Sequence, residues 1–176
     1  MPGASLCRSM VGMDKQELKI QLERQLKEKA RLAGRSAREC ADEAMNGATG
    51  KEKTVDSRVA MEFASLARGQ KERAQKATTA LQAIEGFALP TLGTRSRVCV
   101  GAVVEIEDED TGEGRTFFLA PVGAGMTLLG PGGDGHLSVV TPASPVGKAV
   151  MGRRVGEVID VTVQGQLREW QIVWVE

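Results

Sequence analysis

Apolar residues recur every three or four positions along the first half of the chain, which is the period of an amphipathic helix. One run begins at Leu18 and ends at Ala44, and a second begins at Ala60 and ends at Ile84. Most positions between them are polar, and no proline falls between Pro2 and Pro90 to interrupt a helix. Between the runs lies Asn46-Gly47-Ala48-Thr49-Gly50, a composition typical of a turn. The pattern predicts an antiparallel helical hairpin over residues 14–45 and 51–85.

The apolar positions of each run form a narrow seam of the kind that two packed helices share. The seam positions are Leu18, Leu22, Leu26, Ala30, Ala33, Ala37, Ala41 and Ala44 in the first run, and Ala60, Phe63, Ala67, Gln70, Ala74, Ala77, Leu81 and Ile84 in the second. Alanine dominates near the turn, so we expect a slim hairpin there. Thr49 and Glu52 have the spacing of a capping box for the second helix. A dimeric coiled-coil scaffold is the alternative use of such seams, although two runs of matching length can satisfy each other within one chain.

The second half of the chain shows the shorter periods and the turn residues of a sheet. Residues 87–176 hold 14 of the 21 glycines and five of the six prolines. Ser144-Pro145 has the composition of a helix start, and Gly152 that of a helix end. The predicted strands are Ala102–Glu107, Arg115–Ala120, Met126–Leu129, Leu137–Thr141, Glu157–Val163 and Leu167–Val175. The fold class predicted is α+β, with a coiled-coil hairpin followed by a small antiparallel β-sheet domain carrying one short helix.

Composition limits the classes of function. The 23 basic side chains balance 23 acidic ones, although residues 1–86 are mildly basic and residues 87–176 acidic, so a broad phosphate-gripping surface is not expected. No apolar run approaches the roughly 18–20 residues of a membrane span. The three cysteines, Cys7, Cys40 and Cys99, have no metal-site spacing and are typical of a reducing, cytoplasmic environment. We divide the chain into an N-terminal extension (1–12), a hairpin (13–88) and a sheet domain (89–176).

One segment carries a family resemblance. It runs Ser144-Pro145-Val146-Gly147-Lys148-Ala149-Val150-Met151-Gly152-Arg153-Arg154-Val155-Gly156-Glu157-Val158. This stretch resembles the C-terminal signature of the Gre-factor (GreA/GreB) transcription elongation family. Gly101-Ala102-Val103-Val104 is similar to the start of the same domain, and the order of hairpin and α+β domain is similar from Met13 onward.

The resemblance implies an FKBP-like sheet domain that docks on RNA polymerase, and a hairpin whose tip enters the secondary channel. It implies an accessory factor, not an enzyme, which at most stimulates the polymerase's own transcript cleavage and touches the nascent RNA and DNA only indirectly. It also implies a monomer. The candidate polymerase-binding residues are Lys51, Ser144, Pro145, Lys148, Arg153 and Arg154.

The tip departs from the family pattern. Gre factors carry an Asp-Leu-Lys-Glu-Asn motif whose two carboxylates help to hold a Mg²⁺ ion of the polymerase active site, as paired hard oxygen ligands suit that ion. The matching residues here are Thr49-Gly50-Lys51-Glu52-Lys53, in which Thr49 replaces the first acid. Asp56 follows Glu52 by four residues, one helical turn away, and is a substitute partner. Glu52 and Asp56 are the tip candidates, and no cofactor belongs to the chain itself.

Other interpretations fit parts of the chain. A regulator similar to the Rnk proteins would have a shorter coiled coil, and one similar to DksA would bring a cysteine zinc site. The interpretation as a prolyl isomerase rests on fold analogy alone, and the presence of only five aromatic residues disfavours the aromatic-lined pocket that such an enzyme needs.

The acidic run Glu105–Asp110 is interpreted as a strand end and solvated turn, and His136 as a loop or strand-start residue. Trp170 and Trp174 are interpreted as core residues that share one strand face.

Overall fold

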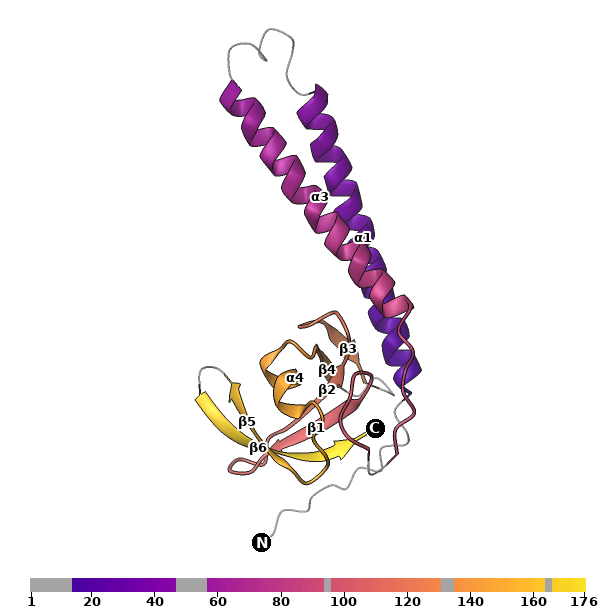
Figure 1. The fold of residues 1–176 in the computed structure, drawn as a ribbon, viewed down its shortest axis with the longest axis vertical. Helices are drawn as coiled ribbons and strands as arrows, with labels where there is room; N and C mark the ends of the chain where they lie inside the picture. The colour runs from indigo at the N-terminus through magenta and orange to yellow at the C-terminus, as the bar shows by residue number, and fades with distance from the viewer. Residues whose placement is uncertain (1–13, 47–56, 94–95, 131–134, 164–165) are drawn as a thin grey trace. The chain divides into compact units, whose positions relative to one another are not determined.

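We describe the fold from a computed structural model, which defines residues 14–46, 57–93, 96–130, 135–163 and 166–176. Two long helices come first, and six strands with one short helix follow (Figure 1). The elements are α1 (Lys15–Asn46), α3 (Ser57–Glu85), β1 (Val103–Asp108), β2 (Gly114–Leu119), β3 (Thr127–Leu129), β4 (His136–Val140), α4 (Pro145–Val150), β5 (Val158–Val163) and β6 (Gln166–Val175). The α+β class, the two long helices and all six strands are confirmed, each strand within one residue of its predicted bounds.

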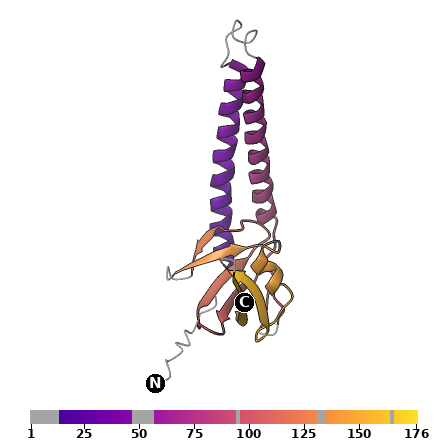
Figure 2. The same cartoon turned by 90° about the vertical axis from the view of Figure 1, so that its left-hand side faces the viewer.

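The helical hairpin begins where Asp14 supplies the first hydrogen bonds of α1. Its carboxylate accepts from the Gln16 backbone N–H at 3.0 Å, and its carbonyl accepts from Glu17 and Leu18. Figures 1 and 2 show α1 and α3 side by side. The Lys19 ammonium donates to the Glu85 carbonyl at 3.5 Å, so the start of α1 lies beside the end of α3 and the helices are antiparallel. We call this end the base, and the end at Asn46 and Ser57 the turn end.

Burial follows the predicted seam and weakens away from the base. Leu22, Leu26, Ala77 and Ile84 are buried, whereas the seam alanines closer to the turn end are half-buried. Phe63 is 43% exposed, which contradicts its prediction as a buried seam residue. The alanines that α1 presents near the turn end have too little side chain to cover an aromatic ring. The capping-box pair Thr49 and Glu52 lies outside the described residues.

The sheet has the strand order β3-β4-β2-β1-β6-β5. Neighbouring strands are antiparallel except β2 and β4, which run parallel, with Phe117 opposite Ser138 and Leu119 opposite Val140. The prediction of an antiparallel sheet is therefore corrected to a mixed one. The reason is topological: β3 forms the edge, so β4 turns back from it and enters the sheet in the direction of β2.

A β-bulge interrupts the pairing of β1 with β6. Ile106 lies opposite Ile172, but the residue before it on β1, Glu105, lies opposite Trp174. Val173 on β6 is therefore the extra residue. Because an extra residue reverses the alternation of side chains, Val175 and not Trp174 returns to the core. The prediction that Trp170 and Trp174 share a buried strand face is wrong: Trp170 is fully buried and Trp174 only partly.

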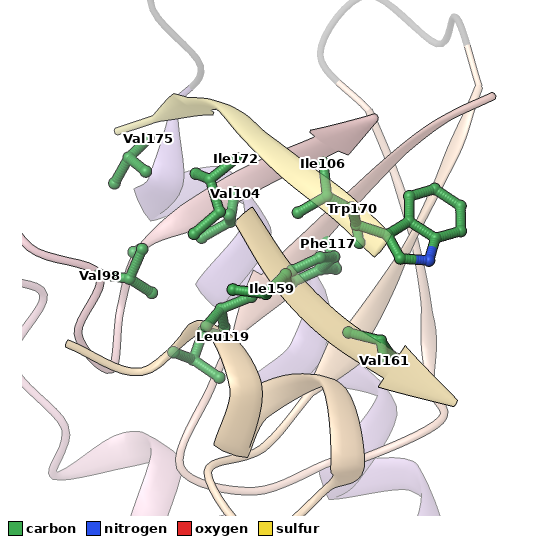
Figure 3. Close-up of a cluster of buried hydrophobic side chains, with 12 residues drawn as sticks. Val98, Val104, Ile106, Phe117, Leu119, Ile159, Val161, Trp170, Ile172 and Val175 are labelled. Carbon is green, nitrogen blue, oxygen red and sulfur yellow. The ribbon is translucent and has the colours of Figure 1, made fainter. Parts of the chain in front are cut away.

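The core of the sheet domain lies between one face of the sheet and α4. Figure 3 shows its members, which come from strands far apart in sequence. The buried cluster contains Val98, Ala102, Val104, Ile106, Phe117, Leu119, Val150, Ile159, Val161, Trp170, Ile172 and Val175. Burying a Val-, Leu- or Phe-sized side chain contributes about 1.5–3 kcal/mol relative to leaving it exposed, so this cluster is the main source of the domain's stability.

The chain divides into two compact units. One consists of residues 19–88 with the short loop 121–123, and the other contains the sheet. Among the described residues, no helix is both long enough and apolar enough to cross a membrane.

Candidate functional site

The segment that carries the family signature begins with a capped helix. The Ser144 hydroxyl oxygen accepts a hydrogen bond from the Gly147 backbone N–H at 3.0 Å and donates to the Thr141 carbonyl at 2.8 Å. Pro145 occupies the first helical turn, where its missing N–H costs nothing. The predicted cap is therefore confirmed. Ser144 is half-buried and engaged in these two bonds, so its part in any site is to hold α4 in place.

Gly147 allows α4 to approach the preceding loop closely. A Cβ atom at this position would lie 2.0 Å from the Thr141 carbonyl oxygen and 2.8 Å from its carbonyl carbon. These are backbone atoms, which cannot rotate away as a side chain can. Only glycine fits here, and the family-like Ser-Pro-x-Gly pattern thus has a steric origin.

The chain leaves α4 through a second fixed turn. Met151 caps the helix and Gly152 follows with φ 76°, a conformation that favours glycine. The Gly152 N–H donates to the Val98 carbonyl at 2.8 Å, and the Val98 N–H donates to the Arg153 carbonyl at 2.8 Å. This reciprocal pair ties the residues after α4 to a segment more than fifty residues earlier.

The structure brings three of the predicted cations to this turn. Lys148, Arg153 and Arg154 are all exposed, and we call them the α4 basic surface. Glu157 organises two of them: its carboxylate accepts from the Arg153 guanidinium at 3.1 Å and from the Arg154 backbone N–H at 3.1 Å. Pro145 is exposed on the same helix. The turn thus presents exposed cationic side chains on a backbone fixed by hydrogen bonds.

Arg97 is a further cation at this turn that the sequence analysis missed. Its guanidinium donates to the Gly152 carbonyl at 2.9 Å, and its side chain is exposed. No local pattern could have identified it, because it is 55 residues away from Gly152. The tip candidates Glu52 and Asp56 and the polymerase-binding candidate Lys51 lie outside the described residues.

Asp108 is the one member of the acidic run that does not fit the interpretation as a solvated turn. Its side chain is only 3% exposed. Its carboxylate accepts from the backbone N–H groups of Thr111 at 2.9 Å and Asp110 at 3.0 Å, and pairs with Arg168 at 3.4 Å. The hydrogen bond from Thr111 is the main cause that lowers the pKa of Asp108 below its ordinary value. Asp108 therefore shapes the β1–β2 turn.

Within the described residues, no three His, Cys, Asp or Glu side chains are grouped as metal ligands.

Comparisons with known proteins bear on the same region. Residues 93–176 match the family model "Transcription elongation factor, GreA/GreB, C-term". The chain is 32% identical over 81 residues to transcription inhibitor protein Gfh1 of Thermus aquaticus, covering 46% of this chain and 48% of that protein. It is 31% identical over 103 residues to transcription elongation factor GreA of Polaromonas naphthalenivorans, covering 58% and 60%. The chain spans about half the length of the curated relatives it matches.

A solved structure of the transcription factor Gfh1 is also similar, at 22% identity with a TM-score of 0.40 over 89% of this chain and 94% of that one. Two long helices followed by a mixed sheet with a capped α4 define a hairpin-plus-α+β protein. Its sheet domain is a GreA/GreB C-terminal domain. This match confirms, for residues 93–176, the resemblance seen in the sequence.

Proposed function

We propose that this protein is a transcription factor that binds RNA polymerase and places its hairpin in the secondary channel. The observation that carries the proposal is the GreA/GreB match over residues 93–176, preceded in the same chain by two antiparallel helices of 32 and 29 residues. At 1.5 Å per residue these helices rise roughly 40–50 Å. That length suits a probe that reaches from a docking domain into a channel.

In this proposal the α4 basic surface is a docking element of the sheet domain. Lys148, Arg153 and Arg154 are exposed cations on a rigid turn, so they can meet an acidic surface of the polymerase without ordering the backbone. The domain around them carries 11 acidic and 7 basic side chains, so these cations stand out from their surroundings. Ser144 and Gly147 support them by fixing α4.

We further propose that the hairpin modulates the polymerase mainly by occupying the channel. Thr49 stands where a Gre factor has its first tip acid, so the carboxylates left for a shared Mg²⁺ are Glu52 and Asp56, which follows four residues later. Without the first acid of the family motif this set is reduced, so we expect it to hold a hard cation more weakly, and we assign no step of cleavage to it. The named relatives include both an elongation factor and an inhibitor.

The first experiment tests polymerase binding through the α4 basic surface. The full chain is incubated with core RNA polymerase, and binding is measured for wild type and for Lys148→Gln/Arg153→Gln/Arg154→Gln. We expect the triple variant to bind at least tenfold more weakly, and wild-type binding to weaken as salt is added. The matched control is Lys148→Arg/Arg153→Lys/Arg154→Lys, which keeps the charge and should bind nearly as wild type. Absence of wild-type binding at micromolar protein would refute the proposal.

The second experiment separates occupancy from cleavage. Backtracked elongation complexes are treated with wild type, Glu52→Ala and Thr49→Asp. We expect little cleavage by wild type and a gain with Thr49→Asp, which restores the carboxylate pair. Strong wild-type cleavage that disappears in Glu52→Ala would show instead that Glu52, with Asp56, is sufficient for cleavage stimulation.

A further inference from the structure

The concave face of the sheet contains a cavity that the proposed function does not use. Its volume is about 580 Å³, within the range of small-ligand sites. Pairing register explains its lining. Arg115 lies opposite Ile106, and Phe117 lies opposite Ser138, so residues from β1, β2 and β4 meet on one face. Trp170 and Val161 complete the floor, and Val146 of α4 lies at the other side.

Trp170 carries an unsatisfied donor at this cavity. Its side chain is fully buried, and its indole Nε1 is the buried side-chain polar atom that finds no hydrogen-bond partner within the described part of the chain. Leaving such a donor unpaired costs about 1–3 kcal/mol. Figure 3 shows the indole at one end of the buried cluster. The Arg115 guanidinium lies over this ring, 5.3 Å from its centroid.

Arg115 brings a positive charge to the cavity, and none of the residues lining it is acidic, although the surrounding domain is acidic overall. The carboxylate partner of Arg115 is Glu113, whose Oε1 accepts hydrogen bonds from the guanidinium at 2.9 Å and 3.2 Å. Glu113 is not among the residues that line the cavity. An unpaired N–H and a cation both call for an acceptor-rich, negatively charged ligand.

The remaining lining specifies the body of that ligand. Phe117, Val161 and Val146 are apolar residues of the lining, and Thr116 and Ser138 are its hydroxyl-bearing residues. The aromatic residues Phe117 and Trp170 thus line one cavity, which corrects the expectation from composition that this domain lacks an aromatic-lined pocket. A fitting ligand therefore has an apolar group beside a carboxylate, and amide groups that bond to the hydroxyls and to the indole N–H. A short acidic peptide has this chemistry.

We propose that this cavity binds a protein segment in which an apolar side chain precedes an acidic one. The apolar side chain lies against Phe117 and Val161, and the carboxylate pairs with Arg115 in place of Glu113. A backbone carbonyl of the segment accepts the hydrogen bond from Trp170 Nε1 once Arg115 has turned toward the carboxylate. This binding is separate from polymerase docking through α4, so either proposal can fail without the other.

The probe is the capped dipeptide acetyl-Phe-Glu-amide, titrated into the ¹⁵N-labelled full chain. The chain has two tryptophans, which provide a reporter and an internal control. We expect the Trp170 indole N–H resonance to move downfield with saturation while that of Trp174 stays in place. The neutral acetyl-Phe-Gln-amide should bind at least fivefold more weakly. Equal binding of the two dipeptides, or no movement of the Trp170 resonance at millimolar peptide, would overturn the proposal.

Three variants test the assignment of Arg115. Arg115→Gln should weaken binding of the acidic dipeptide at least fivefold, and Lys148→Gln, which removes a cation outside the cavity, should leave it unchanged. Glu113→Gln should strengthen binding two- to fivefold, because it removes the internal competitor for Arg115. A folding defect cannot produce that gain. Glu113→Gln without effect, or free glutarate binding as tightly as the dipeptide, would contradict recognition of a peptide carboxylate.

Discussion

The hairpin and the sheet domain bury the same kinds of side chain in different ways. In the sheet domain, Leu119 and Trp170 are fully buried, because β2 and β6 each have neighbours on both sides and this face of the sheet lies under α4. In the hairpin, the seam residue Leu22 near the base is fully buried, but the seam residue Phe63 nearer the turn end is 43% exposed. Two helices share a single seam, so burial there depends on the size of the facing residue. The comparison teaches that the sheet domain buries a large cluster together, whereas burial in the hairpin is graded along one seam.

The largest expected effect tests the grading within the hairpin. Leu22→Ala removes a fully buried side chain and should lower the free energy of unfolding by about 2–5 kcal/mol. Leu66→Ala makes the same chemical change at a half-exposed position and should cost no more than about 0.5 kcal/mol. Urea unfolding followed by circular dichroism at 222 nm measures both. Similar losses at the two positions would remove the distinction between buried seam positions and exposed positions outside the seam.

In the sheet domain, added volume is expected to be costly where the backbone is in close contact. Gly147→Ala places a methyl group against the Thr141 carbonyl and should destabilise the protein by about 1–3 kcal/mol. Gly93→Ala is the matched control, because an added methyl group there meets nothing within 4 Å. Tryptophan fluorescence during urea unfolding follows this domain specifically, since both tryptophans belong to it. A Gly147→Ala protein as stable as wild type would show that α4 can shift freely.

A smaller effect is expected from the cap of α4. Ser144→Ala loses the bond from the Gly147 N–H and should cost about 1 kcal/mol, whereas Ser144→Thr keeps a hydroxyl and should cost less. Because the cap also positions Lys148, the alanine variant should weaken polymerase binding without any change of charge. Intact stability in Ser144→Ala would mean that water or another group replaces the hydroxyl.

The pH dependence that Asp108 gives to the free energy of unfolding is confined to acidic conditions. Its pKa is lowered on folding, chiefly by the hydrogen bond from the Thr111 N–H, so the charged form stabilises the native state. That contribution is present above the ordinary aspartate pKa of 3.8 and is lost as the pH falls through the lower, folded-state value. Stability of Asp108→Asn should therefore depend less on pH below about 4 than that of wild type. Parallel pH profiles of the two proteins would contradict this assignment.

The features that the sequence predicted are those with a local cause. Leu22 and Ile84 fall on seams that a three–four period identifies, and Ser144-Pro145 carries its own cap. The strands follow from alternation and from turn residues between them. Each of these features depends on residues that are close together in the sequence, so the sequence alone is enough to predict it.

The features that escaped prediction depend on partners far along the chain. The bulge at Val173 exists only in the pairing of β1 with β6, so alternation alone placed Trp174 on the wrong face. The parallel pairing of β2 with β4 depends on where β3 lies in the sheet. Asp108 differs from its acidic neighbours because it accepts hydrogen bonds within its turn and meets Arg168, 60 residues later. For the same reason Arg115 and Trp170 could not be assigned to one cavity beforehand.

The position of β1 in the sheet sets an order of events in time. It pairs with β2, which follows at once, but also with β6, and the Val103 and Glu176 backbones exchange hydrogen bonds of 2.8 and 3.0 Å. A ribosome adds about 5–20 residues per second, so β1 waits several seconds for its second partner. During that delay Val104 and Ile106 lack the strand beside which they are finally buried. Both hairpin helices are already synthesised by then, so the sheet domain is completed only after the hairpin.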